Sequence, residues 1–151
     1  MNAKPEIGTI QTGFLNVLSI SPLEEDHLSL QAVFHFSKWM LFKADRVSRA
    51  LSLLQEHDIS VIVCEADAMP GAWTEVLQHI QKMPNSPALI VTSRVADEHL
   101  WAEALNLGAW DVLAKPFSRT ELIRTVKTAW NHWHYQIESA PKTIHMASAA
   151  S

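Results

Sequence analysis

The residues that could carry chemistry in this sequence lie in polar segments that directly follow predicted strands. The segments are Ser21, the run from Glu65 to Gly71, Thr92-Ser93 and Lys115-Pro116. The Lys115 ammonium could pair with the carboxylate of Glu65 or of Asp67, and such a buried ion pair would favour one conformation more than it would add stability. No nucleophile stands beside a general base in these segments, so the sequence does not predict an enzyme.

Metal and cysteine chemistry have few candidates in the chain. Eight histidines suggest a metal site, but the closest pair, His132 and His134, is two residues apart and does not share a helix face. The single cysteine, Cys64, excludes an intrachain disulfide and a cage of several cysteines, and its apolar strand indicates a buried, unreactive thiol. The sequence contains no glycine-rich phosphate loop and no zincin motif. We therefore expect neither a metal nor a cofactor.

The elements that position these segments alternate between short β-rich runs and longer helical patterns, five of each. Strands are predicted over residues 14–20, 39–42, 59–64, 88–91 and 112–114. The run 59–64 is nearly all apolar and mostly β-branched, which is typical of a central parallel strand. This alternation predicts a doubly wound α/β sheet, whose ligand site lies outside the carboxyl ends of the strands.

Local signals place the ends of the five predicted helices. Ser21 with Glu24, and Ser118 with Glu121, have the spacing of capping boxes, which predicts helices from about residue 22 and from residue 118. In the first helix, apolar residues at positions 28, 32 and 36 predict the buried stripe. Asp45 is predicted to cap the second helix, and Gly108 to end the helix over residues 97–107.

Length and composition are those of one globular domain. The chain has 151 residues, 48% of them hydrophobic and 19% charged, and we expect a leader over 1–12, one domain over 13–137 and a disordered tail over 138–151. The net charge of −4 argues against nucleic-acid binding. Neither an apolar run of about 20 residues nor a signal-peptide core is present, which predicts no membrane contact and a cytoplasmic protein.

Several short motifs, taken in their order and spacing, resemble a response-regulator receiver domain over about residues 14–135. The motifs are Met69-Pro70-Gly71, Thr92, Gly108-Ala109 and Lys115-Pro116-Phe117. The resemblance implies a flavodoxin-like (βα)5 sheet with strand order 2-1-3-4-5 and a role in bacterial two-component signal transduction. Residues 96–117 more narrowly resemble divergent single-domain receivers from environmental bacteria.

The chain departs from the receiver pattern where the metal site is expected. A phosphorylated receiver needs two adjacent acids after the first strand and an acceptor aspartate after the third, because Mg²⁺ requires hard oxygen ligands. Here the first strand ends in Leu18-Ser19-Ile20-Ser21-Pro22, without an acid. Glu24, Glu25 and Asp26 follow in the first helical turn, where negative charge suits the helix dipole and where we expect these side chains to face solvent.

The acceptor position is also altered. Four residues before Pro70, where the resemblance places the acceptor, stands Ala66, between Glu65 and Asp67. A one-residue adjustment of the loop could bring either acid into the pocket. A glutamate there would resemble the charge of the phosphorylated state more than it would accept phosphate, so Asp67 is the only plausible acceptor. We favour the interpretation that Asp67 is a loop or capping residue.

Two positions match the part of the pattern that senses phosphorylation, and one does not. Thr92 and Lys115 stand where the resemblance implies a hydroxyl and an ammonium that contact the phosphoryl group. The family's switch residue, an aromatic three positions before the lysine, is Val112 here, with Trp110 two residues earlier. A β-branched valine has one preferred rotamer and no ring to swing inward, so the switch is predicted to be disabled.

Tryptophans gather on the side of the fourth helix, fifth strand and fifth helix, the side that the resemblance implies as a dimer or partner face. Trp101, Trp110 and Trp130 are candidate interface residues, whereas Trp73 and Trp133 are expected in the core.

Our main hypothesis is an atypical, stand-alone receiver that acts through protein–protein contact without phosphorylation. Its expected partner is a histidine kinase, another regulator or a second copy. The alternative is a receiver phosphorylated on Asp67 through a rearranged loop, with Glu24 or Glu25 as a Mg²⁺ ligand. A small α/β enzyme is the third and weakest hypothesis.

Overall fold

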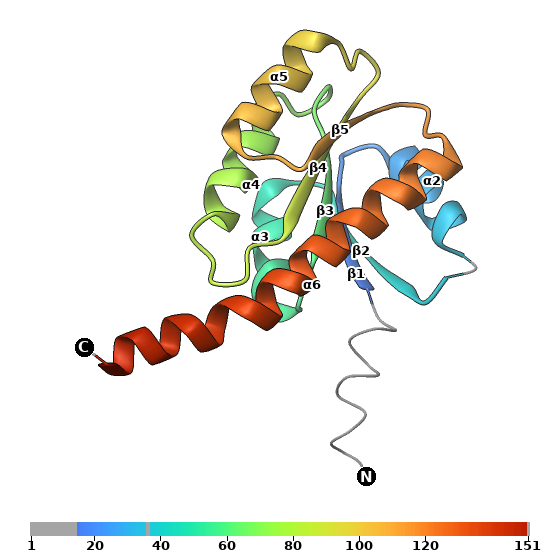
Figure 1. The fold of residues 1–151 in the computed structure, drawn as a ribbon. Coiled ribbons are helices and arrows are strands. Elements are labelled where there is room, and N and C mark those ends of the chain that lie inside the picture. The colour runs from blue at the N-terminus through green and yellow to red at the C-terminus, as the bar shows by residue number, and fades with distance from the viewer. Residues whose placement is uncertain (1–14, 36, 151) are drawn as a thin grey trace.

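A parallel sheet of five strands forms the centre of the molecule (Figure 1). The computed structural model describes residues 15–35 and 37–150, with side chains as far as residue 136. The strands are β1 (Leu15–Ile20), β2 (Trp39–Ala44), β3 (Val61–Glu65), β4 (Ala88–Ser93) and β5 (Asp111–Ala114). Their spatial order is β2-β1-β3-β4-β5, which confirms the predicted order 2-1-3-4-5 and the flavodoxin-like fold.

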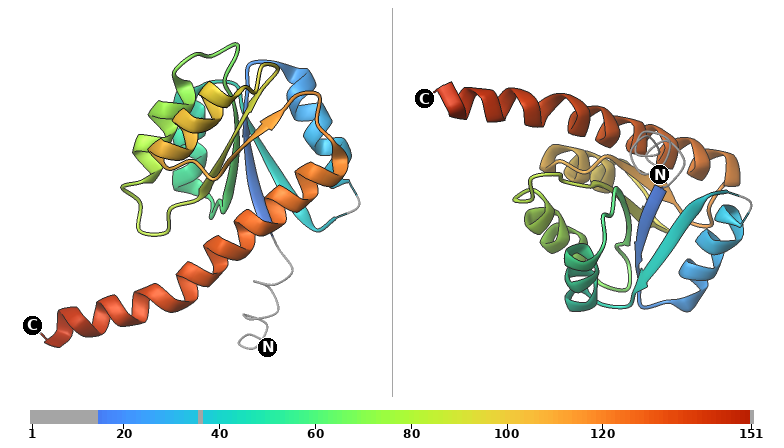
Figure 2. Two further views of the ribbon diagram at one scale, coloured as in Figure 1. Left: turned by 45° about the horizontal axis from the view of Figure 1, so that its top comes forward. Right: turned by 90° about the horizontal axis from the view of Figure 1, so that it is seen from below.

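Helices cover both faces of this sheet (Figure 2). They are α2 (Glu24–Phe34), α3 (Val47–Glu56), α4 (Ala72–Ile80), α5 (Glu98–Leu107) and α6 (Arg119–Ala150). Residues of α3, α4 and α5 pack in one apolar cluster with one face of the sheet, and residues of α2 and α6 pack in a second cluster with the other face. Every residue of β3 is buried, as its apolar, mostly β-branched sequence predicts for a central strand.

The predicted helix caps are partly confirmed. The hydroxyl of Ser118 accepts from the Glu121 N–H at 3.3 Å, and Gly108 ends α5 with a φ of 114°. The predicted caps at Ser21 and Asp45 are wrong. Ser21 accepts instead from the N–H of Leu23, one residue before α2 begins. Asp45 lies one residue before the N-cap position of α3 and pairs with the neighbouring arginine side chain.

The sequence predicted a leader at one end of the chain and a disordered tail at the other. The predicted leader over 1–12 lies outside the described residues. Helix α6 continues past residue 138, where the sequence predicted a disordered tail, and it extends beyond the sheet (Figure 2). Alanines, which have the highest helix propensity, are frequent in this part of α6. The domain bounds 13–137 stay a prediction.

Candidate functional site

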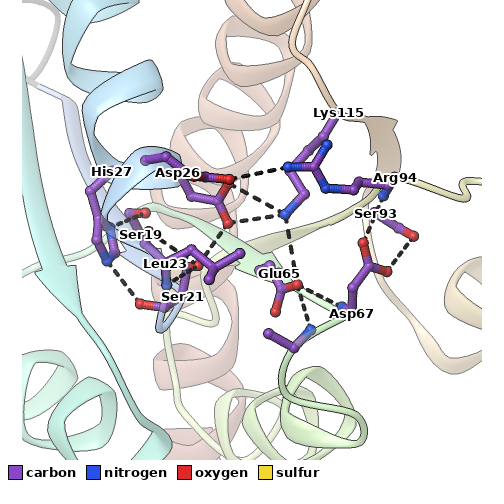
Figure 3. A network of polar contacts seen from close by, with 12 residues as sticks. Ser19, Ser21, Leu23, Asp26, His27, Glu65, Asp67, Ser93, Arg94 and Lys115 are labelled. Atoms are coloured by element: carbon purple, nitrogen blue, oxygen red, sulfur yellow. Dashed lines mark hydrogen bonds and ion pairs between the residues drawn. The ribbon is translucent and has the colours of Figure 1, made fainter.

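Three charged side chains meet inside the protein at the carboxyl ends of the strands (Figure 3). Asp26 lies in the first turn of α2, which follows β1; Glu65 ends β3; and Lys115 follows β5. Their side chains are 9%, 1% and 4% exposed, respectively. Parallel strands bring these segments together because all their carboxyl ends lie at the same edge of the sheet.

Lys115 stands between the two acids. Its Nζ lies 3.0 Å from Oδ2 and 3.3 Å from Oδ1 of Asp26, and 3.7 Å from Oε1 of Glu65. Of the two partners that the sequence offered for Lys115, the structure brings Glu65 to it and turns Asp67 away. A buried ammonium needs such partners because removal of an ion from water costs several kcal/mol.

The position of Asp26 corrects one expectation. Glu24 and Glu25 are exposed, as expected, but Asp26 is buried. The reason is the phase of the helix, because Asp26 shares a stripe with the buried Leu30 and Phe34, each four residues further on. The stripe predicted at residues 28, 32 and 36 is wrong at Leu28, which is 54% exposed, and at Ala32, which is also exposed. Its last member, residue 36, lies outside the described residues.

Glu65 holds the loop that follows β3. Its Oε1 accepts from the backbone N–H groups of Asp67 and Ala68, at 2.7 Å each. Consecutive N–H groups that converge in this way form a nest for an anion. The nest is therefore occupied by the protein's own carboxylate. The other oxygen, Oε2, is buried and has no hydrogen-bond partner among the described residues.

Asp67 points away from this pocket. Its carboxylate accepts from the Ser93 hydroxyl at 2.6 Å and from the Arg94 N–H at 2.8 Å. Partial burial raises the pKa of Asp67, but these hydrogen bonds and the charges of Lys115 and Arg94 outweigh it, so the pKa is lowered. Ionised Asp67 therefore stabilises the folded protein at pH values above the pKa that its carboxyl has in the unfolded chain. This contribution is lost as the pH falls through the lower pKa that Asp67 has in the folded protein.

A second hydrogen-bond network continues from Asp26 to a buried histidine that sequence reasoning missed. The Ser21 hydroxyl donates to Asp26 Oδ2 at 2.7 Å, and the Ser21 carbonyl lies 2.9 Å from Nε2 of His27. A carbonyl oxygen only accepts, so Nε2 carries a proton. Nδ1 of His27 lies 2.7 Å from the hydroxyl of Ser19. The network thus holds the segment between β1 and α2 beside the ion pairs of Lys115.

The remaining predicted positions are spread around this centre. Thr92 is buried and is the register partner of Glu65, but the hydroxyl that binds the loop acid belongs to Ser93. Val112 is buried in the apolar cluster beneath α4 and α5. Cys64 is also buried, and burial together with the charge of Glu65 raises the pKa of its thiol to about 12. The thiol is therefore unreactive, as the sequence indicated.

The candidate interface tryptophans differ in exposure. Trp101 is 51% exposed, whereas Trp110 and Trp130 are half-buried and lie against the rings of His132 and His134, respectively. Each of these histidines thus contacts its own tryptophan. Trp73 is buried, as predicted, whereas Trp133, also predicted in the core, is only half-buried. Among the residues that the structure describes, no group of three histidine, cysteine, aspartate or glutamate side chains could hold a metal ion.

A doubly wound parallel sheet with acids and a lysine at the carboxyl ends of its strands defines a flavodoxin-like α/β protein with its site at the switch point of the strand order. Residues 27–127 match the family model of the response regulator receiver domain, and the chain belongs to this family. Receiver domains are generally signalling modules of two-component systems and interact with kinases or other regulators.

No described helix is long and apolar enough to span a bilayer.

Solved receiver domains share the fold at low sequence identity. The receiver of an HD domain-containing protein from Pseudomonas fluorescens is 24% identical, with a TM-score of 0.71 over 80% of this chain and 98% of that one. A receiver from Clostridium thermocellum is 18% identical, with a TM-score of 0.69 over 78% and 95%. The beryllofluoride-activated NtrC4 receiver, a dimer in solution, is 24% identical, with a TM-score of 0.70 over 78% and 98%. No curated protein matches the sequence.

Proposed function

We propose that this chain is an atypical receiver that signals through protein–protein contact without being phosphorylated. The observation that carries the proposal is the Glu65 carboxylate, which accepts from two loop amides and lies 3.7 Å from Lys115. In a phosphorylated receiver, the resemblance implies that the lysine contacts the phosphoryl group. Here two carboxylates of the protein already pair with Lys115, Asp26 at 3.0 Å and Glu65 at 3.7 Å, so the lysine does not lack an acidic partner.

The surroundings of Glu65 support the same proposal. Asp26, the one buried acid near the end of β1, accepts from Lys115 and Ser21 and offers no free pair of oxygens to Mg²⁺. Glu25 pairs with Arg94, and Glu24 lies 4.0 Å from Lys43 at the surface. The two ligands that the alternative hypothesis needs thus lie beside cations at the surface.

A test of the proposal is a titration with beryllofluoride and Mg²⁺, which together imitate an aspartyl phosphate. We expect the amide spectrum of the ¹⁵N-labelled protein to stay unchanged, because Glu65 already fills the nest. The matched control is Asp67→Asn, which removes the exposed candidate acceptor. Amide shifts around residues 66–68 and 115 in the wild type that vanish in this variant would instead support phosphorylation on Asp67, with Glu24 or Glu25 as a metal ligand.

The partner face that we propose lies around α5, β5 and α6, with Trp101 as its anchor. Its partner would be a histidine kinase or another regulator. The support is the half-exposed indole of Trp101 on α5, because exposed tryptophans are frequent anchors of protein interfaces.

Alanine substitutions should distinguish an exposed tryptophan from a packed one on this face. We expect Trp101→Ala to change the free energy of unfolding by no more than about 0.5 kcal/mol, as is usual at exposed positions. Trp110→Ala should cost about 2–3 kcal/mol, because this ring packs against the apolar cluster and against His132. Urea unfolding followed by circular dichroism measures both values. Equal losses would place Trp101 in the core and remove it as an anchor.

A further inference from the structure

Strand β2 forms one edge of the sheet and is unusually apolar for an edge. It reads Trp-Met-Leu-Phe-Lys-Ala, with Lys43 as its one charge. The Met40 side chain is 52% exposed, and Trp39, Leu41 and Phe42 are only half-buried. Proteins commonly protect edge strands with several charges, prolines or bulges, because an open apolar edge pairs with other chains.

The backbone of this edge is also open. The Ala44 carbonyl accepts from the N–H of Ser21, which follows β1, so Ala44 and, by alternation, Phe42 bond toward the sheet. Leu41 and Lys43 therefore direct their N–H and carbonyl groups outward. Among the described residues these groups have no hydrogen-bond partner. A groove of about 280 Å³ runs beside the strand, between residues 39–43 and the end of α2.

We propose that a second copy of this chain occupies this edge, with the two β2 strands antiparallel about a two-fold axis through Leu41. In a continuous antiparallel pair, two side chains that lie directly opposite each other are on the same face of the sheet. The two-fold axis keeps each side chain on its own face. The axis must therefore pass through a residue and not between two neighbouring residues. With Leu41 on the axis, its outward N–H and carbonyl groups bond to those of Leu41 in the second copy. The outward N–H of Lys43 meets the carbonyl of Trp39 in the second copy.

Charge favours this register over an axis through Lys43. With Leu41 on the axis, the Lys43 ammonium lies opposite the Trp39 indole of the second copy, a favourable cation–π pair. Met40 then lies opposite Phe42. An axis through Lys43 would instead place the two Lys43 side chains opposite each other, and like charges directly opposite each other are destabilising. The dimer would leave the face of Trp101 free, because β2 and β5 are opposite edges of the sheet.

The first experiment compares two substitutions at Lys43 by sedimentation velocity of the full chain over a range of concentrations. Lys43→Pro removes the outward N–H, which an edge strand tolerates, whereas Lys43→Ala removes the charge and keeps the N–H. We expect the wild type to dimerise as the concentration rises. Lys43→Ala should weaken dimerisation by about 5–30-fold, because it removes two symmetry-related cation–π pairs. Lys43→Pro should weaken it by at least about tenfold more, because it also loses two symmetry-related hydrogen bonds.

A wild type that stays monomeric to millimolar concentration, or a Lys43→Pro variant that dimerises like Lys43→Ala, would overturn the proposal. Circular dichroism establishes whether each variant is folded. If Lys43→Pro does not fold, the next experiment decides the question alone.

The second experiment tests the register by cross-linking single cysteine variants, in which the native Cys64 is buried and does not compete. Leu41→Cys would place two cysteines opposite each other across the axis, with Cα atoms about 5.5 Å apart, a distance that a disulfide spans. Met40→Cys is more exposed but does not lie opposite itself. Mild oxidation should therefore form a disulfide between two Leu41→Cys chains and leave Met40→Cys without a cross-link. Equal cross-linking, or cross-linking of Met40→Cys alone, would contradict the proposed pairing.

Discussion

Replacement of Lys115 with methionine is expected to lower the free energy of unfolding by about 3–5 kcal/mol, the usual cost of removing one partner from a buried ion pair. The variant leaves Asp26 and Glu65 without their shared cation, and both side chains are almost completely buried. Methionine fills a similar volume, so the loss would measure the charge rather than a cavity. Urea unfolding at neutral pH measures the change.

The matched control is Lys43→Met. Lys43 also faces an acid, Glu24, but at 4.0 Å and with both side chains exposed. An exposed pair of this kind contributes at most about 1 kcal/mol. Adding Asp26→Asn to the Lys115→Met variant should recover part of the loss, because it removes one of the two uncompensated charges. Equal losses for Lys115→Met and Lys43→Met would show that the three-residue cluster does not hold the switch-point loops together.

Removal of the Glu65 side chain should have the second largest effect, about 2–4 kcal/mol for Glu65→Ala. The backbone N–H groups of Asp67 and Ala68 would lose their acceptor, and a hydrogen bond to a charged group contributes about 1.5–3 kcal/mol. Glu65→Gln keeps a carbonyl oxygen for both N–H groups, and the Lys115–Asp26 pair remains. We therefore expect Glu65→Gln to cost less than Glu65→Ala, about 1–2 kcal/mol, because its amide NH2 takes the buried, unpartnered place of Oε2.

The comparison between the two Glu65 variants separates hydrogen bonding from charge. If the carboxylate holds the loop through its contacts with the amides, amide hydrogen exchange at residues 67 and 68 should accelerate in Glu65→Ala and stay slow in Glu65→Gln. Similar losses of stability and similar exchange in both variants would show instead that the negative charge, and not the accepting oxygen, maintains the loop.

Much of the fold could be predicted from the sequence because its signals are local and repeated. The apolar, mostly β-branched run that ends at Cys64 predicted the central strand, and the alternation with helical patterns predicted a doubly wound sheet. Helix caps were less predictable, since a shift of one residue changes which side chain reaches the free N–H groups. This is why the cap at Ser118 is right and those at Ser21 and Asp45 are wrong.

The site was predictable only in part, because it depends on helix phase and on the path of a loop. The loops that carry Glu65 and Lys115 follow from the strand order, but the burial of Asp26 depends on the phase of α2. Spacing four residues back from Pro70 indicated Ala66, whereas the carboxylate that fills the nest comes from Glu65 at the end of β3. No sequence pattern states which of two neighbouring acids a loop turns inward.

The central claim is that this receiver acts without phosphorylation, and the intact mass of the protein tests it most directly. The wild type and Asp67→Asn would be incubated with Mg²⁺ and acetyl phosphate, beside a receiver that accepts phosphate under the same conditions. The proposed function predicts no gain in mass for either form while the reference receiver is modified. A gain of about 80 Da, one phosphoryl group, in the wild type that disappears in Asp67→Asn would contradict it.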